Sequence, residues 1–189
     1  MLLRFDHCYV THPAGLREAS CFENVHNFLK GLAPIIPNPS QPDFQRSTSV
    51  RNTLSGHLTK ESGWQANFLA FTNVSASVPK KNYIVDFVFD FEMDTCPNKH
   101  RVVLEVCFDN RQAIGTNLLK LDKAVSDFVS KQGREAEAIL VCADRRTLDF
   151  GGWDSGVADE EEYQIALSQG YKSYLKAPIS LMVLRVGAK

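Results

Sequence analysis

Long apolar runs are missing from this sequence. Hydrophobic residues make up 44% of its 189 residues, yet no stretch approaches the roughly 20 consecutive apolar residues that a membrane-spanning helix needs. The opening letters, MLLRFDHCYV, are too short and too polar for the apolar part of a secretory signal. We therefore expect a protein that has no membrane partner and works in the cytoplasm.

Paired cysteines and an excess of charge of one sign are missing as well. The five cysteines are scattered without a CxxC pair, which disfavours a disulfide scaffold and favours reduced thiols inside a cell. Lysine and arginine number 21, aspartate and glutamate 22, and the formal net charge is -1. This balance excludes the global basic excess of a protein that coats nucleic acid without specificity. Any anionic partner must therefore meet a local basic patch.

Internal repeats, low-complexity segments and heptad arrays are also absent, which excludes solenoids and long coiled coils. The length suffices for one domain with a substantial core, and no shift in composition separates two parts of the chain. We therefore expect a single domain over residues 1–189.

The spacing of apolar residues predicts alternating helices and strands. Helical spacing recurs over residues 13–32, about 49–62, about 112–129 and about 157–169. A period of two marks the expected strands 82–92 and 101–108, and apolar runs mark two more, 138–143 and 179–186. Loops are expected at the proline-rich residues 33–45 and the glycine-rich residues 149–156. The two alternating strands predict a hairpin, and the strand, helix and strand that follow predict a parallel crossover. The fold class is therefore α/β, with a central mixed β-sheet flanked by helices.

Three carboxylates are expected to share one face of the predicted hairpin. Asp86 and Asp90 have the same parity on the first strand, and Glu105 has the matching parity on the second. Like charges brought together need a cation, and an all-oxygen cluster suits Mg²⁺. The simpler alternative is that these acids lie on the solvent-exposed face of an antiparallel hairpin. Apolar residues on the same face argue against that alternative, namely Ile84, Val88, Val103 and Cys107.

The order of three segments resembles a known nuclease family. These segments are VDF at 85–87, LEVCFDNR at 104–111 and NLLKL at 117–121. Together they are similar to type II restriction endonucleases of the BglII and BstYI kind, relatives of BamHI in the PD-(D/E)xK nuclease superfamily. The likeness extends over most of the chain, although no single motif is specific by itself.

The resemblance implies a restriction-endonuclease-like fold and Mg²⁺-dependent hydrolysis of double-stranded DNA at a short palindromic site, with a GATC-like centre. It also implies a homodimer, whose two-fold symmetry would match the palindrome, in the cytoplasm of a prokaryote. Two alternatives remain open, a DNA-binding protein of the same fold with impaired catalysis and an interaction protein without affinity for DNA.

The resemblance also assigns roles to residues of the hairpin. Asp86 and Glu105 match the family's metal-binding carboxylates, and Val106 is the third residue of the metal site. Asp90, expected roughly opposite Glu105, could share the role of Asp86. Cys107 lies where the superfamily usually has lysine, where BglII-like enzymes have glutamine and where BamHI has glutamate.

Three interpretations of Cys107 are open, because a thiol neither carries the positive charge of lysine nor suits Mg²⁺ as a ligand. The protein cleaves DNA with Cys107 only lining the catalytic site. Alternatively, a lysine of the next helix, Lys120 or Lys123, takes over the missing role. In the third interpretation the protein binds DNA without cutting it.

For DNA recognition the resemblance points to residues 151–156 and the helix that follows, with Asp154 and Ser155 reading base edges in the major groove. The alternative role for Ser155 is to cap that helix, with the acidic residues 159–162 stabilising its positive end. Contacts to DNA are further expected from Asn110 and Arg111, directly after the second hairpin strand. Expected phosphate contacts, each of which has a solvated surface charge as its alternative, are Arg111, Arg145, Arg146, Lys80 and Lys81.

Overall fold

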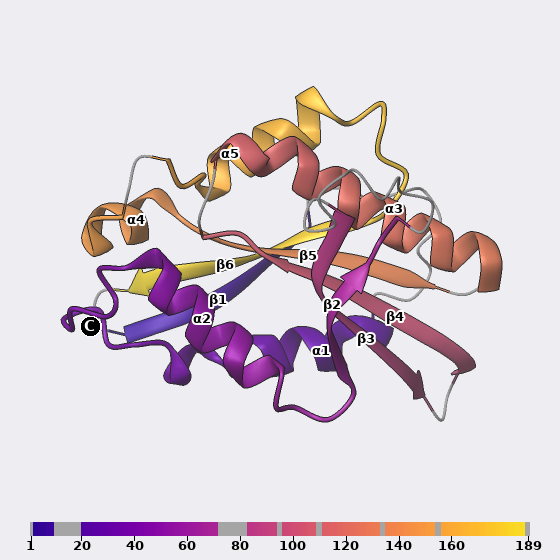
Figure 1. The fold of residues 1–189 in the computed structure, drawn as a ribbon, viewed down its shortest axis with the longest axis horizontal. Coiled ribbons are helices and arrows are strands. Elements are labelled where there is room, and N and C mark those ends of the chain that lie inside the picture. The colour runs from indigo at the N-terminus through magenta and orange to yellow at the C-terminus, as the bar shows by residue number, and fades with distance from the viewer. Residues whose placement is uncertain are drawn as a thin grey trace.

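The computed structural model describes residues 2–9, 20–71, 83–93, 96–108, 111–132, 135–153 and 156–187. Within these residues, six strands form one sheet in the order β1-β6-β5-β4-β3-β2 (Figure 1). The central pairs β4·β5 and β5·β6 are parallel, and the outer pairs are antiparallel. The strands are β1 (Leu2–Tyr9), β2 (Trp64–Leu69), β3 (Ile84–Met93), β4 (Cys96–Val106), β5 (Ala136–Ala143) and β6 (Ile179–Gly187).

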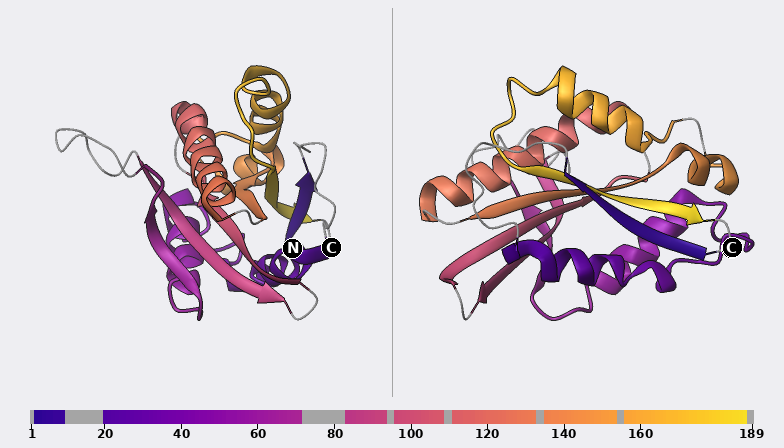
Figure 2. Two further views of the ribbon diagram at one scale, coloured as in Figure 1. Left: turned by 90° about the vertical axis from the view of Figure 1, so that its right-hand side faces the viewer. Right: turned by 180° about the vertical axis from the view of Figure 1, so that it is seen from behind.

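Helices cover both faces of this sheet (Figures 1 and 2). One face carries α3 (Ile114–Gln132) and α5 (Glu160–Ile165), and the other carries α1 (Ser20–Lys30) and α2 (Ser47–Leu58). The predicted α/β class with a mixed sheet flanked by helices is therefore confirmed. The remaining helical segments in the described ranges are η1 (Ala33–Ile35), η3 (Arg111–Ala113), α4 (Arg145–Gly151) and the π-helical turn η4 (Ala166–Gly170).

Strand β4 shows how the sequence pattern divides the core. Val102, Leu104 and Val106 belong to the cluster of buried residues shared with α1 and α2. Val103 and Cys107 belong to the cluster shared with α3 and α5. Successive side chains of a strand point to opposite faces of the sheet, so Glu105 lies on the face that α3 covers. Burial of both faces accounts for the nearly continuous apolar character of β5 and of residues 102–106 in β4.

Several elements differ from the sequence predictions. The strands β1 and β2 and the helix α4 were not expected, and the predicted loop 149–156 begins inside α4. Residues 62–64 do not end a helix, because α2 stops at Leu58 and Trp64 opens β2. Gly63 makes this turn with a φ of +90°, and a Cβ atom there would lie 2.7 Å from the ring of Phe89. Only glycine fits both requirements.

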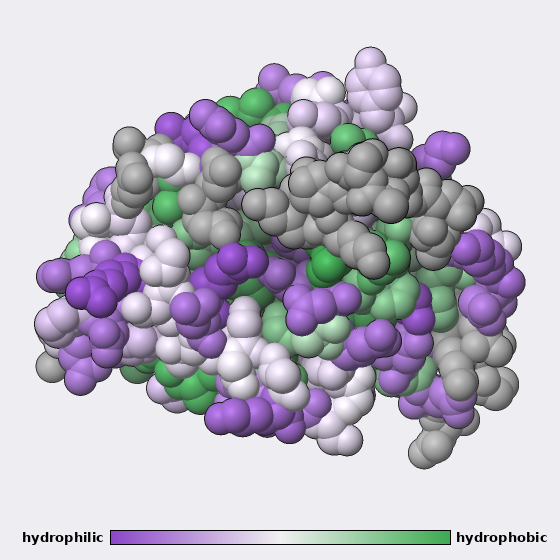
Figure 3. Space-filling model, viewed as in Figure 1, coloured by the Kyte–Doolittle hydropathy of each residue, from purple (hydrophilic) through white to green (hydrophobic). Residues whose placement is uncertain are grey.

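The exposed surface is mixed in character. In the view of Figure 3 most of the coloured surface is hydrophilic, with hydrophobic residues in small groups between. Large apolar side chains that are exposed include Leu119, Phe150, Ile165 and Tyr174. None of the helices in the described ranges is both long enough and apolar enough to cross a lipid bilayer.

Candidate active site

The carboxylates of Asp86 and Glu105 lie side by side on neighbouring strands. The antiparallel register of the hairpin pairs Phe87 with Leu104, which sets Asp86, the residue before Phe87, opposite Glu105, the residue after Leu104. The backbone N–H of Asp86 donates to Glu105 Oε2 at 3.1 Å, and the backbone N–H of Val106 donates to Asp86 Oδ2 at 2.9 Å. The two acidic side chains that the sequence singled out are thus held by reciprocal backbone hydrogen bonds across β3 and β4.

A basic side chain contacts each of these carboxylates. Lys120 Nζ lies 2.6 Å from Glu105 Oε1, and the two side chains are only 7% and 6% exposed. Arg51 of α2 reaches Asp86 Oδ1 with Nη2 at 3.2 Å. Each of the four carboxylate oxygens therefore has a hydrogen-bond donor. The site combines two acidic and two basic side chains at the edge of the core.

Helix α3 supplies Lys120 because of its position on the buried face. Asn117, Lys120 and Leu121 are all buried, and residues three and four apart lie on the same side of a helix. Lys120 and Lys123 were the two candidates to replace the lysine that the superfamily usually has at the position of Cys107. Of these two, only Lys120 contacts Glu105. Lys123 instead pairs with Asp127 at 2.5 Å on the same helix.

The charge state of Glu105 follows from this environment. Burial raises the pKa of its carboxyl, the nearby charge of Asp86 raises it further, and Lys120 lowers it, so that the pKa is about 7. An ordinary glutamate has a pKa of about 4.3. At neutral pH a proton therefore competes with any cation for this carboxylate.

The expected place of Asp90 is wrong. In the register of the hairpin Asp90 lies opposite Arg101, not opposite Glu105. Its two carboxylate oxygens accept hydrogen bonds from Arg101 at 2.6 and 2.7 Å. Asp90 lies four residues, or two periods of the side-chain alternation, beyond Asp86 on β3, so it takes no part in the Asp86–Glu105 pair.

Cys107 sits behind this pair as a buried, neutral thiol. Its side chain is buried, and Asn117 Nδ2 donates to its sulfur at 3.1 Å. The hydroxyl of Tyr163 from α5 is hydrogen-bonded to the same thiol. Burial, followed by the charge of Glu105, raises the pKa of Cys107 well above its ordinary value. The thiol therefore fills a small polar network between β4, α3 and α5.

Replacement of Cys107 by alanine tests whether this thiol has a chemical role. For the DNA cleavage that the sequence resemblance implies, we expect the variant to keep a rate within about threefold of the unaltered protein. We also expect it to lose about 1–2 kcal/mol of unfolding free energy, because a buried sulfur and its hydrogen bonds disappear. Urea denaturation and initial cleavage rates measure the two effects. Cys142 of β5 is also a buried free cysteine, so Cys142→Ala is the matched control. A cleavage defect of more than tenfold in Cys107→Ala alone would contradict the packing role.

The arginines expected to contact phosphates are partly engaged with the start of α5. Arg111 Nε lies 2.7 Å from Glu162, and Arg145 Nη2 lies 2.6 Å from Asp159. Arg146 is exposed. Phosphate contacts by Arg111 or Arg145 would have to replace or share these ion pairs.

The N-terminus of α5 also corrects the predicted cap. The helix begins at Glu160, and Asp159 caps it by accepting from the backbone N–H of Glu162 at 3.0 Å. The side chain of Glu162 returns the contact by accepting from the backbone N–H of Asp159, which completes a capping box. Ser155 is therefore not the cap. The other expected DNA contacts lie outside the described residues, namely Asn110, Asp154, Ser155, Lys80 and Lys81.

The donors present fit a hard divalent cation. Asp86 and Glu105 offer carboxylate oxygens, the ligands that Mg²⁺ prefers. A cation there would relieve the repulsion that raises the pKa of Glu105. Val106 contacts Asp86 through its backbone N–H. This hydrogen bond orients the Asp86 carboxylate, which would be the metal ligand. Sequence reasoning did not single out Arg51, Asn117 or Tyr163, although Asn117 precedes Lys120 by one helical turn.

The pKa of Glu105 predicts how Mg²⁺ binding depends on pH. Below pH 7 the carboxyl is protonated and must lose its proton to bind a cation. The apparent Kd for Mg²⁺ should therefore rise about tenfold for each unit by which the pH falls. Above pH 7 the carboxylate is already ionised, and the Kd should level off. Isothermal titration calorimetry between about pH 5.5 and 8.5 measures this dependence. Asp90→Asn should leave the curve unchanged, whereas a Kd independent of pH would contradict Glu105 as a ligand.

Comparison with known proteins yields no match, either to a protein-family model or to a curated protein.

Proposed function

We propose that this protein is a Mg²⁺-dependent endonuclease that hydrolyses phosphodiester bonds of double-stranded DNA. The observation that carries the proposal is the contact of Lys120 Nζ with Glu105 Oε1 at 2.6 Å, directly beside Asp86. Two acids and a buried lysine at adjoining positions of a hairpin and its following helix match what metal-assisted phosphoryl transfer requires. The order of the same segments resembles restriction endonucleases, which supports a restriction-endonuclease-like fold.

Each residue of the site has a distinct role in this proposal. Asp86 and Glu105 would hold the cation, which supplies positive charge for the phosphoryl oxygen and acidity for an attacking water. Lys120, as an ammonium group, would stabilise negative charge that develops on the scissile phosphate. Arg51, whose side chain is 33% exposed, would bind the phosphate from the opposite side of the carboxylates. No covalent intermediate with the protein is needed.

The wider features of the proposal follow the same resemblance. A homodimer would read a short palindromic site, since two-fold symmetry in the protein matches two-fold symmetry in the DNA. A GATC-like centre of that site is part of the proposal, as is a prokaryotic cytoplasm.

A second candidate function is binding of a DNA site without cleavage. The observation that favours it is that Arg51, Lys120 and two backbone amides already satisfy all four oxygens of Asp86 and Glu105. Such an ion-pair network is stable without a metal. In this case Cys107 would mark the loss of the usual catalytic lysine.

Incubation with plasmid DNA distinguishes these functions. The nuclease proposal expects discrete fragments in the presence of Mg²⁺ and none when EDTA replaces the metal. A plasmid that is retarded in a gel but stays uncut would support the binding protein. A plasmid that is neither cut nor retarded would contradict both functions and favour a protein without affinity for DNA. Sequencing of the fragment ends would then give the recognition site and the position of the cut.

A further inference from the structure

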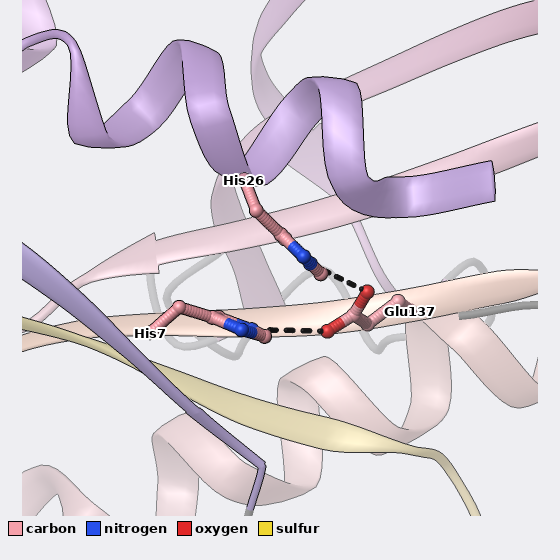
Figure 4. A group of neighbouring side chains, drawn as sticks. All are labelled: His7, His26 and Glu137. Atoms are coloured by element: carbon pink, nitrogen blue, oxygen red, sulfur yellow. Dashed lines mark hydrogen bonds and ion pairs between the residues drawn. The ribbon is translucent and has the colours of Figure 1, made fainter. Parts of the chain in front are cut away.

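A second polar cluster lies on the face of the sheet opposite to the carboxylate pair. It consists of His7 from β1, His26 from α1 and Glu137 from β5, and Figure 4 shows both imidazole rings pointing at the carboxylate. Glu137 is bordered in β5 by apolar residues, and Ile139 and Val141 on its side of the strand belong to the core under α1 and α2. Three segments that are distant in the sequence thus bring two nitrogen ligands and one carboxylate together in the core.

The separations between the ligand atoms of this cluster are close to those found around one bound metal ion. His26 Nε2 lies 2.9 Å from Glu137 Oε2, and His7 Nε2 lies 3.6 Å from Glu137 Oε1. The ligand atoms of the three residues are all within 4.8 Å of one another. Around a tetrahedral Zn²⁺ with bonds of about 2.0–2.1 Å, neighbouring ligand atoms are about 3.3 Å apart. The two observed separations bracket this value.

Burial and hydrogen bonding make the cluster suitable for holding a cation. The side chains of His7, His26 and Glu137 are 4–6% exposed, and a buried carboxylate needs a compensating positive charge. The hydroxyl of Ser180 donates to Glu137 Oε1 at 2.5 Å. A hydrogen bond of this kind orients a carboxylate ligand and is typical of the surroundings of metal sites.

The two histidine rings of the cluster are stacked. Their ring centroids are 3.7 Å apart with an angle of 24° between the planes. This arrangement brings both imidazoles to the same side of the Glu137 carboxylate, where one divalent ion can be bound through Nε2 of each ring. A metal there would also balance the charge of the buried carboxylate.

We propose that His7, His26 and Glu137 bind one Zn²⁺ ion, which ties β1 and α1 to the central strand β5. Two histidines and one carboxylate are a known zinc ligand set, and the fourth position takes a water or another small ligand. The proposal does not depend on nuclease activity, because the cluster lies across the sheet from Asp86 and Glu105. It concerns the stability of the fold.

Metal analysis of the untagged chain tests this site. The protein is stripped with EDTA, given one equivalent of ZnSO₄ and desalted, and we expect about one zinc per chain by mass spectrometry. His26→Gln should weaken zinc binding by at least about tenfold. Zinc at about one hundred times its Kd should also raise the Tm of the unaltered protein by about 5–10 °C. Co²⁺ in place of zinc gives visible absorption bands that report the same site.

Two control variants separate this site from others. His57→Gln changes a half-exposed histidine of α2, and Glu105→Gln changes the carboxylate pair; both should keep the zinc. If His26→Gln does not fold, His7→Gln and the Co²⁺ spectrum of the unaltered chain provide the same test. Failure of the unaltered chain to take up zinc would overturn the proposal. So would zinc that survives in both histidine variants, or zinc that is lost in Glu105→Gln.

Discussion

Replacement of Glu105 by alanine is expected to lower the rate of DNA cleavage by about a thousandfold or more while specific DNA binding is largely kept. Glu105 is one of two carboxylates that would hold Mg²⁺, and loss of a metal-binding group removes several kcal/mol of transition-state stabilisation. Binding to DNA depends on contacts with phosphates and bases, which this change does not touch. Initial rates on plasmid DNA measure cleavage, and gel retardation with Ca²⁺ in place of Mg²⁺ measures binding.

The comparison needs one control for chemistry and one for folding. Asp90→Ala removes a carboxylate of the same hairpin that is paired with Arg101, and it should cut at a rate within about threefold of the unaltered protein. Glu105→Ala also leaves Lys120 buried without its partner, a change that costs about 3–5 kcal/mol. Glu105→Gln keeps a hydrogen-bond acceptor and should fold with the same cleavage defect. Cutting that survives in both Glu105 variants would disprove the assignment of this site.

The local part of this site was predictable because it depends on short-range periodicity. A period of two in residues 101–108 placed Glu105 and Cys107 on one face, and the helical spacing after residue 112 placed α3 against it. The parallel crossover from β4 through α3 to β5 then follows from chain order alone. These features need only the identity of neighbouring residues.

The pairing across the hairpin was less predictable, because register depends on the turn. The ladder of β3 and β4 shifts between Phe91 and Met93, and β4 starts at Cys96, before the strand that alternation predicted. Such an irregularity changes which residues lie opposite each other. This is why Asp90 meets Arg101 and Asp86 meets Glu105.

Contacts between distant segments could not be read from the pattern. His7, His26 and Glu137 are contributed by β1, α1 and β5, and no fixed spacing relates them. The one available signal was Glu137 itself, a charged residue beside the apolar run of β5. A charge in a strand that is buried on both faces requires a partner. The sequence does not say from which element that partner comes.

The structure also relates the thiol of Cys107 to the lysine of the site. Cys107 follows directly after β4 and packs against Asn117 of α3. Lys120, one turn further along the same helix, fills the space beside Glu105. A lysine on the helix can thus reach the carboxylate that a lysine at position 107 would have approached from the strand. A small residue at position 107 leaves room for this arrangement.

Replacement of Lys120 by methionine is therefore expected to lower the cleavage rate by about a hundredfold to ten-thousandfold, the range for loss of a charged or proton-transferring group from a catalytic site. Methionine keeps much of the length and apolar contact of the lysine stem, so the packing of α3 should survive. Initial rates on plasmid DNA, together with Mg²⁺ titrations, separate the effect on chemistry from an effect on metal binding.

Lys123→Met provides the matched control, because Lys123 lies on the same helix but pairs with Asp127. It should cut at a rate within about twofold of the unaltered protein. The Lys120→Met defect should persist at saturating Mg²⁺, since a lysine that acts on the scissile phosphate is needed even when the metal is bound. Full recovery at high Mg²⁺ would show that Lys120 only positions Glu105. Equal rates for the Lys120 and Lys123 variants would refute the idea that a helix lysine replaces the one missing from the strand.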